Sequence, residues 1–227
     1  MKKLILVSSF LMGKSFIFAQ KSAVIETFKK YNISTIILDS NAKQNAADYS
    51  YTVHATLITG GQKKVTEEKY HPAKNAAERW ELVSVNGGAP SKTDKKLFNK
   101  EHNQQIPIAK PDSTSYRILK DDADYLIVSY HYDTSTLVAD NNFMKDFPVT
   151  LYINKKNGRL ERSEVISEEP FKVKVFKADY MMVNTTYIYI EKTDQYLPLQ
   201  EETTMSIRIL GRNAEIITSN EYSNYKK

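Results

Sequence analysis

Strand-like segments follow one another along most of this chain, with few helices between them. From residue 49 onwards apolar and polar residues alternate with a period of two, as in Tyr51–Ile58, which is typical of half-buried strands. Gly60-Gly61 and Asn157-Gly158 can supply the positive φ that tight hairpin turns need. Because parallel strands would require long crossover connections, this order predicts an antiparallel sheet in a mainly β fold of the α+β class.

The pattern predicts about ten strands and two or three helices. The expected strands cover residues 49–58, 63–70, 79–85, 115–119, 124–132, 149–154, 160–166, 171–176, 183–191, 198–210 and 214–222. The expected helices cover residues 22–31, 91–103 and a short stretch within 137–147. The apolar segment 33–38 is compatible with either a helix or a strand.

The expected strand 124–132 and residues 187–190 of the expected strand 183–191 carry apolar side chains on both faces. A sheet with one wet face would show polar residues at alternate positions, so we expect both faces to be covered. Core elements on both sides would explain this, and so would a curved sheet with helices or an apolar cavity on its concave face. Candidates for a cavity wall, taken from the strand faces, are Tyr125, Ile127, Tyr187, Tyr189 and Met205.

A secretory signal peptide is predicted at the N-terminus. Lys2 and Lys3 precede the apolar run Leu4–Met12, and Ala19 offers a small residue for cleavage. The run is shorter than the roughly 20 residues of a spanning helix, which favours cleavage after Ala19 over a retained anchor. We expect an exported, periplasmic protein with no transmembrane span after cleavage, in which residues 20–227 form a single domain.

Composition excludes several functional classes. The chain has no cysteine, so disulfides, thiol catalysis and cysteine metal sites are absent. Removal of residues 1–19 leaves 29 basic and 27 acidic residues, a net charge of +2 instead of +5. These charges are dispersed along the chain, whereas nucleic-acid binding needs a clustered basic patch.

No catalytic motif is recognisable, so we expect a non-enzymatic protein without a cofactor or metal. The least favoured alternative is an exported hydrolase centred on His131, which shares a strand face with Asp133 and could form a general-base pair or a metal fragment. The four histidines lack the helical spacing of a zinc site: His54, His71, His102 and His131. Paired acids occur in turns or at strand ends, where solvation is their commoner role: Asp121-Asp122, Glu161 with Glu164, and Glu168-Glu169.

Several segments resemble uncharacterised exported bacterial proteins that are similar to periplasmic lipoprotein carriers of the LolA/LolB type. The first is Glu-Arg-Trp-Glu-Leu-Val-Ser-Val-Asn-Gly at 78–87, followed by Pro90 and a charged helix with Phe98. The others are 143–147, Thr-Leu-Tyr-Ile-Asn at 150–154, Asn-Gly-Arg-Leu-Glu at 157–161, and the tyrosine-bearing strand 221–225. Together the resemblance touches most of residues 45–225.

The resemblance implies a LolA-like domain: a strongly curved antiparallel sheet forming an unclosed barrel, with two or three helices on its concave side. It also implies a hydrophobic cavity that binds lipid or lipoprotein acyl chains, with an envelope protein as a partner. No ligand-contacting residue of the family can be carried over to a numbered position. The alternative is an envelope interaction or structural module that binds protein or glycan through a tyrosine-rich surface, since the chain has 15 tyrosines.

Overall fold

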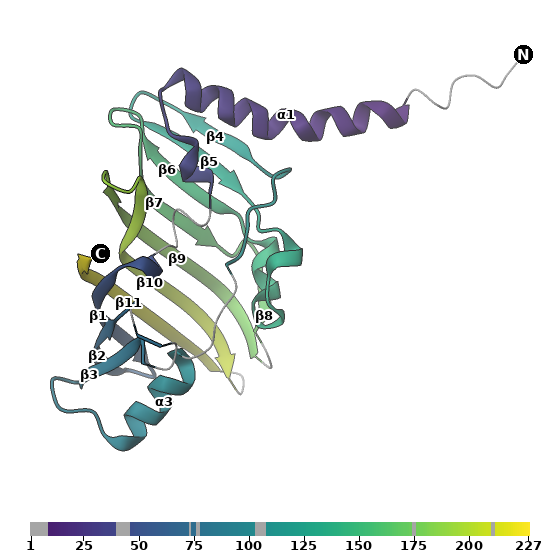
Figure 1. Cartoon of the computed structure of the whole chain (residues 1–227). Helices are drawn as coiled ribbons and strands as arrows, with labels where there is room; N and C mark the ends of the chain where they lie inside the picture. Colours follow the sequence, from purple (N-terminus) through teal and green to yellow (C-terminus); the bar gives the residue numbers. More distant parts are fainter. Residues whose placement is uncertain are drawn as a thin grey trace, which may run out of the picture.

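The structure, a computed structural model, describes residues 9–39, 46–72, 74–75, 78–102, 108–173, 176–209 and 212–227. These residues form one curved antiparallel sheet that does not close into a barrel, with helices on its concave side (Figure 1). The prediction of a mainly β, antiparallel, unclosed architecture is therefore confirmed.

The sheet has eleven strands within the described residues. They are β1 (Ser50–Thr59), β2 (Gln62–Tyr70), β3 (Trp80–Val85), β4 (Arg117–Asp121), β5 (Tyr125–Tyr130), β6 (Val149–Asn154), β7 (Arg159–Ile166), β8 (Phe171–Val173), β9 (Phe176–Ile190), β10 (Gln195–Ile209) and β11 (Arg212–Lys226). The α-helices are α1 (Ser9–Lys30) and α3 (Lys92–His102). The 3₁₀ helices are η1 (Thr35–Leu38), η2 (Ala46–Asp48), η3 (Thr134–Thr136) and η4 (Ala139–Asp146).

The strand order is β3-β2-β1-β11-β10-β9-β7-β6-β5-β4, with β8 paired to β9. Consecutive strands are mostly neighbours joined by short turns, as the sequence predicts. Two features depart from this order. The consecutive strands β3 and β4 form opposite edges of the sheet, and the C-terminal strand β11 lies between β1 and β10, so the first and last strands pair in the middle of the sheet (Figure 1). The helix α3 packs beside the edge strand β3, and α1 contacts the opposite edge strand β4.

The single strand expected at 171–176 is wrong. Strand β8 ends at Val173 and β9 begins at Phe176, and these two residues face each other in an antiparallel pair. The Phe171 ring stacks on Phe143, 5.0 Å between centroids, and meets Phe147 edge-on at 4.8 Å. This aromatic packing accounts for the position of β8, while residues 174 and 175 lie outside the described residues.

The C-terminal part of α1 packs at the β4 end of the sheet. Val24 and Phe28 are fully buried and lie four residues apart on one face of the helix. The helix ends before Asn32, whose φ of 53° is the left-handed conformation common after a helix C-terminus. It begins earlier than the expected residue 22 and continues through Ala19, and residues 1–8 of the predicted signal peptide lie outside the described residues.

None of the helices in the described ranges combines the length and the apolar character that crossing a membrane requires. The core contributions of α1, Val24 and Phe28, both follow the predicted cleavage point after Ala19.

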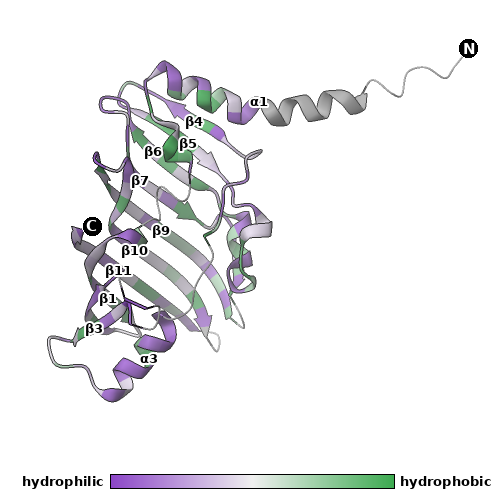
Figure 2. Cartoon of the chain, in the orientation of Figure 1, coloured by the Kyte–Doolittle hydropathy of each residue, from purple (hydrophilic) through white to green (hydrophobic). Residues whose placement is uncertain are grey.

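The main core lies between the concave face of the sheet and the segment that runs from α1 into η1. Apolar residues gather on β5 and β6, whereas α3 is mainly hydrophilic (Figure 2). Leu126 and Val128 of β5 face Ile153 and Leu151 of β6, and all four are completely buried. Ile37 of η1 is equally buried in this core. The apolar segment 33–38 thus becomes a short 3₁₀ helix that covers the sheet.

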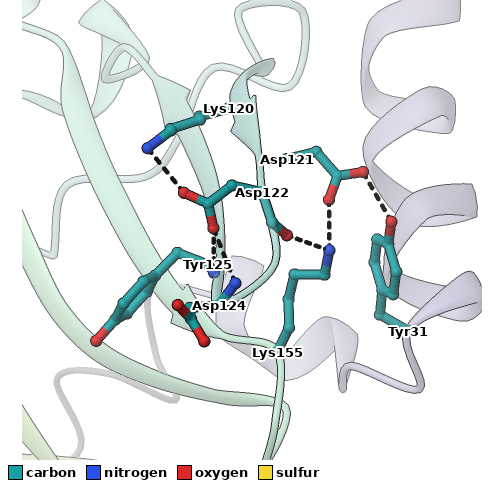
Figure 3. A network of polar contacts seen from close by, with 7 residues as sticks. All are labelled: Tyr31, Lys120, Asp121, Asp122, Asp124, Tyr125 and Lys155. Carbon is teal, nitrogen blue, oxygen red and sulfur yellow. Dashed lines mark hydrogen bonds and ion pairs between the residues drawn. The ribbon is translucent and has the colours of Figure 1, made fainter.

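A polar network ties the end of α1 to the β4–β5 hairpin (Figure 3). The Tyr31 hydroxyl donates to Asp121 at 2.9 Å, and Lys155 donates to the same carboxylate at 2.7 Å. These hydrogen bonds lower the pKa of Asp121. Asp122 accepts from Lys120 and from two backbone N–H groups of the following turn. Instead of being only solvated, as expected, the acid pair Asp121-Asp122 therefore holds this turn through hydrogen bonds.

Candidate functional site

A cavity of about 350 Å³ lies in the middle of the concave face. Residues of β1, β5, β6, β7, β9, β10 and β11 line it, together with Ala46 of η2, Ala109 and Met144 of η4. Strands from both halves of the sheet meet there because the sheet curves. The volume falls at the lower end of the range for pockets that bind small ligands.

Strand register directs the lining side chains. Cross-strand partners share a face, and Thr185 of β9 pairs with Ser163 of β7 on one side and with Glu201 of β10 on the other. Val183 and Tyr187 lie two residues away along β9 and therefore point the same way. The wall is thus a patch of alternate residues from neighbouring strands, as a pleated sheet requires.

Five tyrosines line the cavity: Tyr51, Tyr130, Tyr132, Tyr187 and Tyr222. The Tyr187 hydroxyl shares a hydrogen bond of 2.8 Å with the Ser163 hydroxyl. Burial is the main reason that the pKa of Tyr132 rises to about 12 and that the pKa of Tyr130 lies well above its ordinary value. These tyrosines are therefore neutral at physiological pH and offer apolar rings with polar tips.

Glu201 is a partly buried carboxyl group in the cavity wall. Burial raises its pKa, and a hydrogen bond with its cross-strand partner Asn220 opposes this effect. Burial is the main cause of the raised pKa values of Tyr132, Tyr222 and Tyr187, and the Glu201 charge raises each of them further. The carboxyl therefore lies within electrostatic reach of three tyrosine hydroxyls.

A smaller cavity of about 220 Å³ lies between α3 and the β1–β3 end of the sheet. Its wall includes Glu68, Phe98, His102 and Asn220. The His102 Nε2 atom is 3.3 Å from a Glu68 carboxylate oxygen, and the His102 ring stacks on Phe98 with centroids 3.9 Å apart. Asn220 lines this cavity while it hydrogen-bonds to Glu201 of the central one, so the two cavities are neighbours.

Two opposing effects act on the pKa of His102. Burial lowers the pKa of His102, but hydrogen bonds with Glu68 and with the Phe98 carbonyl outweigh it, so the net pKa is raised. The protonated form is thereby favoured beside a carboxylate that is itself buried. This pair fastens the end of α3 to β2.

An aromatic band connects the two cavities. Tyr51 stacks on Tyr70 at 5.0 Å and meets Trp80 edge-on at 5.8 Å, and its ring also lies 6.0 Å from Tyr222. Trp80 in turn lies 4.7 Å from His102. The alternation predicted for β1 holds only in part, since Val53 is buried as expected but Thr52 is buried as well and Leu57 is exposed.

Of the five predicted cavity residues, Tyr187 lines the central cavity and the other four lie elsewhere. Tyr189 and Met205 pack against the main core without lining that cavity. Tyr125 and Ile127 project from the other face of β5, because alternation commits the buried Leu126 and Val128 to the core face. There the Tyr125 hydroxyl donates to Glu161 at 2.7 Å. The sequence could not assign these directions, since β5 is apolar on both faces.

Sequence reasoning missed Glu201. It stands next to Glu202 in a run of polar residues, which reads as a solvent-facing strand. The available signal was strand periodicity, which places Glu201 four residues before the candidate Met205 and hence on the same face.

Several of the residues considered for acid–base chemistry have local partners. Asp133 caps η3 by accepting hydrogen bonds from the Ser135 backbone N–H at 2.9 Å and hydroxyl at 2.8 Å. Glu161 and Glu164 accept from tyrosines on the outer face, Tyr125 and Tyr152 respectively. In the part of the chain that the structure describes, no cluster of three or more histidine and acidic residues could hold a metal ion.

Comparisons with known proteins return little. No family model and no curated protein matches the chain. Among solved structures it is similar to the crystal structure of a DUF1329 family protein from Desulfovibrio piger, with 10% sequence identity over 83% of this chain and 92% of that one. The TM-score is 0.32, too low to carry an argument about fold or function.

Proposed function

We propose that this protein is an exported envelope protein that binds lipid or lipoprotein acyl chains in the central cavity of its concave face. The observation that carries the proposal is the cavity itself, a space of about 350 Å³ whose wall combines aliphatic side chains and tyrosine rings with the polar side chains of Ser163, Thr185 and Glu201. Burial of an apolar chain there would remove apolar surface from water on both partners. Met144 adds a flexible, polarisable side chain that adapts to ligands of different shape.

The exported location is part of the same proposal. A signal peptide ending at Ala19 would deliver residues 20–227 to the periplasm, where acyl chains of lipids and lipoproteins need shielding from water. The buried residues Val24 and Phe28 remain in the mature chain after such a cut. Mass spectrometry of the protein from its own envelope fraction tests the cut: a mature N-terminus at Gln20 supports it, and an intact Met1 contradicts it.

Ligand binding is tested by native mass spectrometry and by a dye. Detergent-free protein from the envelope should carry extra mass matching a fatty acid, a phospholipid or an acylated peptide. The apo protein should also enhance the fluorescence of the neutral dye N-phenyl-1-naphthylamine. Ala109→Phe, which places a ring in the cavity, should weaken dye binding about tenfold or more, because the ring occupies ligand space. Ala89→Phe, in an exposed loop, is the matched control and should bind like wild type.

A clean apo mass together with no dye enhancement would refute the carrier proposal. The alternative from the sequence, an interaction module of the envelope, would then take precedence. Exposed apolar side chains such as Ile188 at 42% and Leu199 at 49% of full exposure would be the first surface to test for a protein partner.

A further inference from the structure

The charge pattern of the central cavity is one-sided. Among the described residues that line it, Glu201 is the one acidic side chain, and no lysine, arginine or histidine is present. A pocket built for a fatty acid or a phosphate head needs a cation or several N–H donors to balance the negative charge. This wall offers a carboxyl and tyrosine hydroxyls instead.

The tyrosines provide the second observation. Tyr51 and Tyr222 approach the cavity from one end of the sheet, with ring centroids 6.0 Å apart, and Tyr130 and Tyr132 approach from the other, 5.9 Å apart. Aromatic faces attract cations through the ring quadrupole, most strongly where water is excluded. Several rings around a carboxyl group form the combination that recognises organic ammonium ions.

Glu201 is held in place for such a contact. The hydrogen bond from its cross-strand partner Asn220 orients the carboxyl, and Asn220 also hydrogen-bonds to Tyr222. Glu201 lines the same cavity as both groups of rings, and its charge acts on the pKa of one ring of each group, Tyr132 and Tyr222. A positive head group would relieve the desolvation of the carboxylate, whereas an anionic head would add like-charge repulsion in a partly buried site.

We propose that the central cavity selects amphiphiles with a cationic head, an amine or a quaternary ammonium, which Glu201 and the surrounding tyrosine rings bind while the hydrocarbon chain lies against the aliphatic wall. This inference rests on the proposed ligand-binding function and specifies the chemical class of the ligand. The positive group can belong to a free alkylamine or to the head of a zwitterionic lipid.

The test compares ligands that share a chain and differ in charge. Decyltrimethylammonium, decanol and decanoate are titrated, below their aggregation concentrations, against the mature protein loaded with N-phenyl-1-naphthylamine at pH 7.5. The ammonium should displace the dye at about one tenth of the decanoate concentration or less. Glu201→Gln should weaken the ammonium about tenfold and leave decanol unchanged, which also shows that the variant is folded. Glu202→Gln, the exposed neighbour on the same strand, is the matched control and should match wild type.

The outcomes separate this inference from the function on which it rests. Equal displacement by all three ligands, or preference for decanoate, overturns the head-group selectivity and leaves ligand binding intact. No dye binding at all, together with a clean apo mass, refutes the proposed function, and the selectivity with it. A zwitterionic lysophosphatidylcholine distinguishes the sources: displacement as strong as that by the ammonium assigns the head to a lipid, and weaker displacement assigns it to a free amine.

Discussion

Replacement of Phe28 by alanine tests whether α1 is an integral part of the domain. The Phe28 side chain is fully buried in the main core, on the same helical face as Val24. It packs over the concave face of the sheet, next to the network in which Tyr31 and Lys155 share Asp121. If this packing holds α1 against the sheet, the truncation must leave a cavity in the core.

The expected cost follows from the burial. Truncation of a fully buried phenylalanine removes the transfer free energy of the ring and adds the cost of the cavity, about 3–5 kcal/mol of unfolding free energy. In a domain of this size 1 kcal/mol changes the melting temperature by about 2–4 °C. Phe28→Ala should therefore lower the melting temperature by roughly 6–20 °C.

The assay is urea unfolding of the mature chain followed by circular dichroism, supported by thermal melts. Lys29→Ala is the matched control, since Lys29 is the next residue on the exposed side of the helix and its loss should change stability by less than about 0.5 kcal/mol. If Phe28→Ala destabilises the protein no more than Lys29→Ala does, α1 does not contribute to the core and the packing argument is refuted.

Two further predictions concern the ends of the sheet. The pKa of His102 is raised in the folded protein, so its contact with Glu68 stabilises the fold when the imidazole is protonated. This contribution, roughly 1 kcal/mol, is fully present below the ordinary histidine pKa of about 6.5. It is lost as the pH rises through the folded-state pKa. Urea unfolding from pH 5.5 to 8.5 should show this decline in wild type and not in His102→Phe, and parallel curves would disprove it. Gly158→Ala should destabilise by about 1–2 kcal/mol, because Gly158 has a φ of 69° and an added Cβ would lie 3.3 Å from the Asn32 carbonyl oxygen. Gly88→Ala, at an ordinary φ and with its nearest atom at 3.6 Å, should melt close to wild type, and equal losses in the two variants would contradict the strain argument.

Local patterns in the sequence were sufficient to predict most of the strands. The alternation in 149–154 and the Asn157-Gly158 turn predict β6 and the hairpin that follows it, and β6 has the predicted bounds. The Gly60-Gly61 turn likewise joins β1 to β2 in the expected hairpin. These features depend on residues that are close in sequence, where turn chemistry and side-chain periodicity act directly.

The candidate site depended on long-range pairing, which local patterns do not encode. Tyr187 could be predicted as a wall residue, but the direction of Tyr125 and Ile127 could not, because both faces of β5 are apolar. Glu201 reads as a surface residue until its partners are known. The pairing of β10 with β9 and β11 then brings it beside Thr185 and Asn220.

By itself the sequence determined the class of fold, the positions of most strands and turns, and the absence of disulfides. Tertiary structure alone decided that β11 lies between β1 and β10, that the sheet curves around a cavity, and that Glu201 belongs to the wall of that cavity. The physical reason is that hydrogen-bonded strands bring together residues far apart in the chain, such as Thr52 and Ser223. The burial of a side chain, and with it the chemistry available to that side chain, is set by those neighbours.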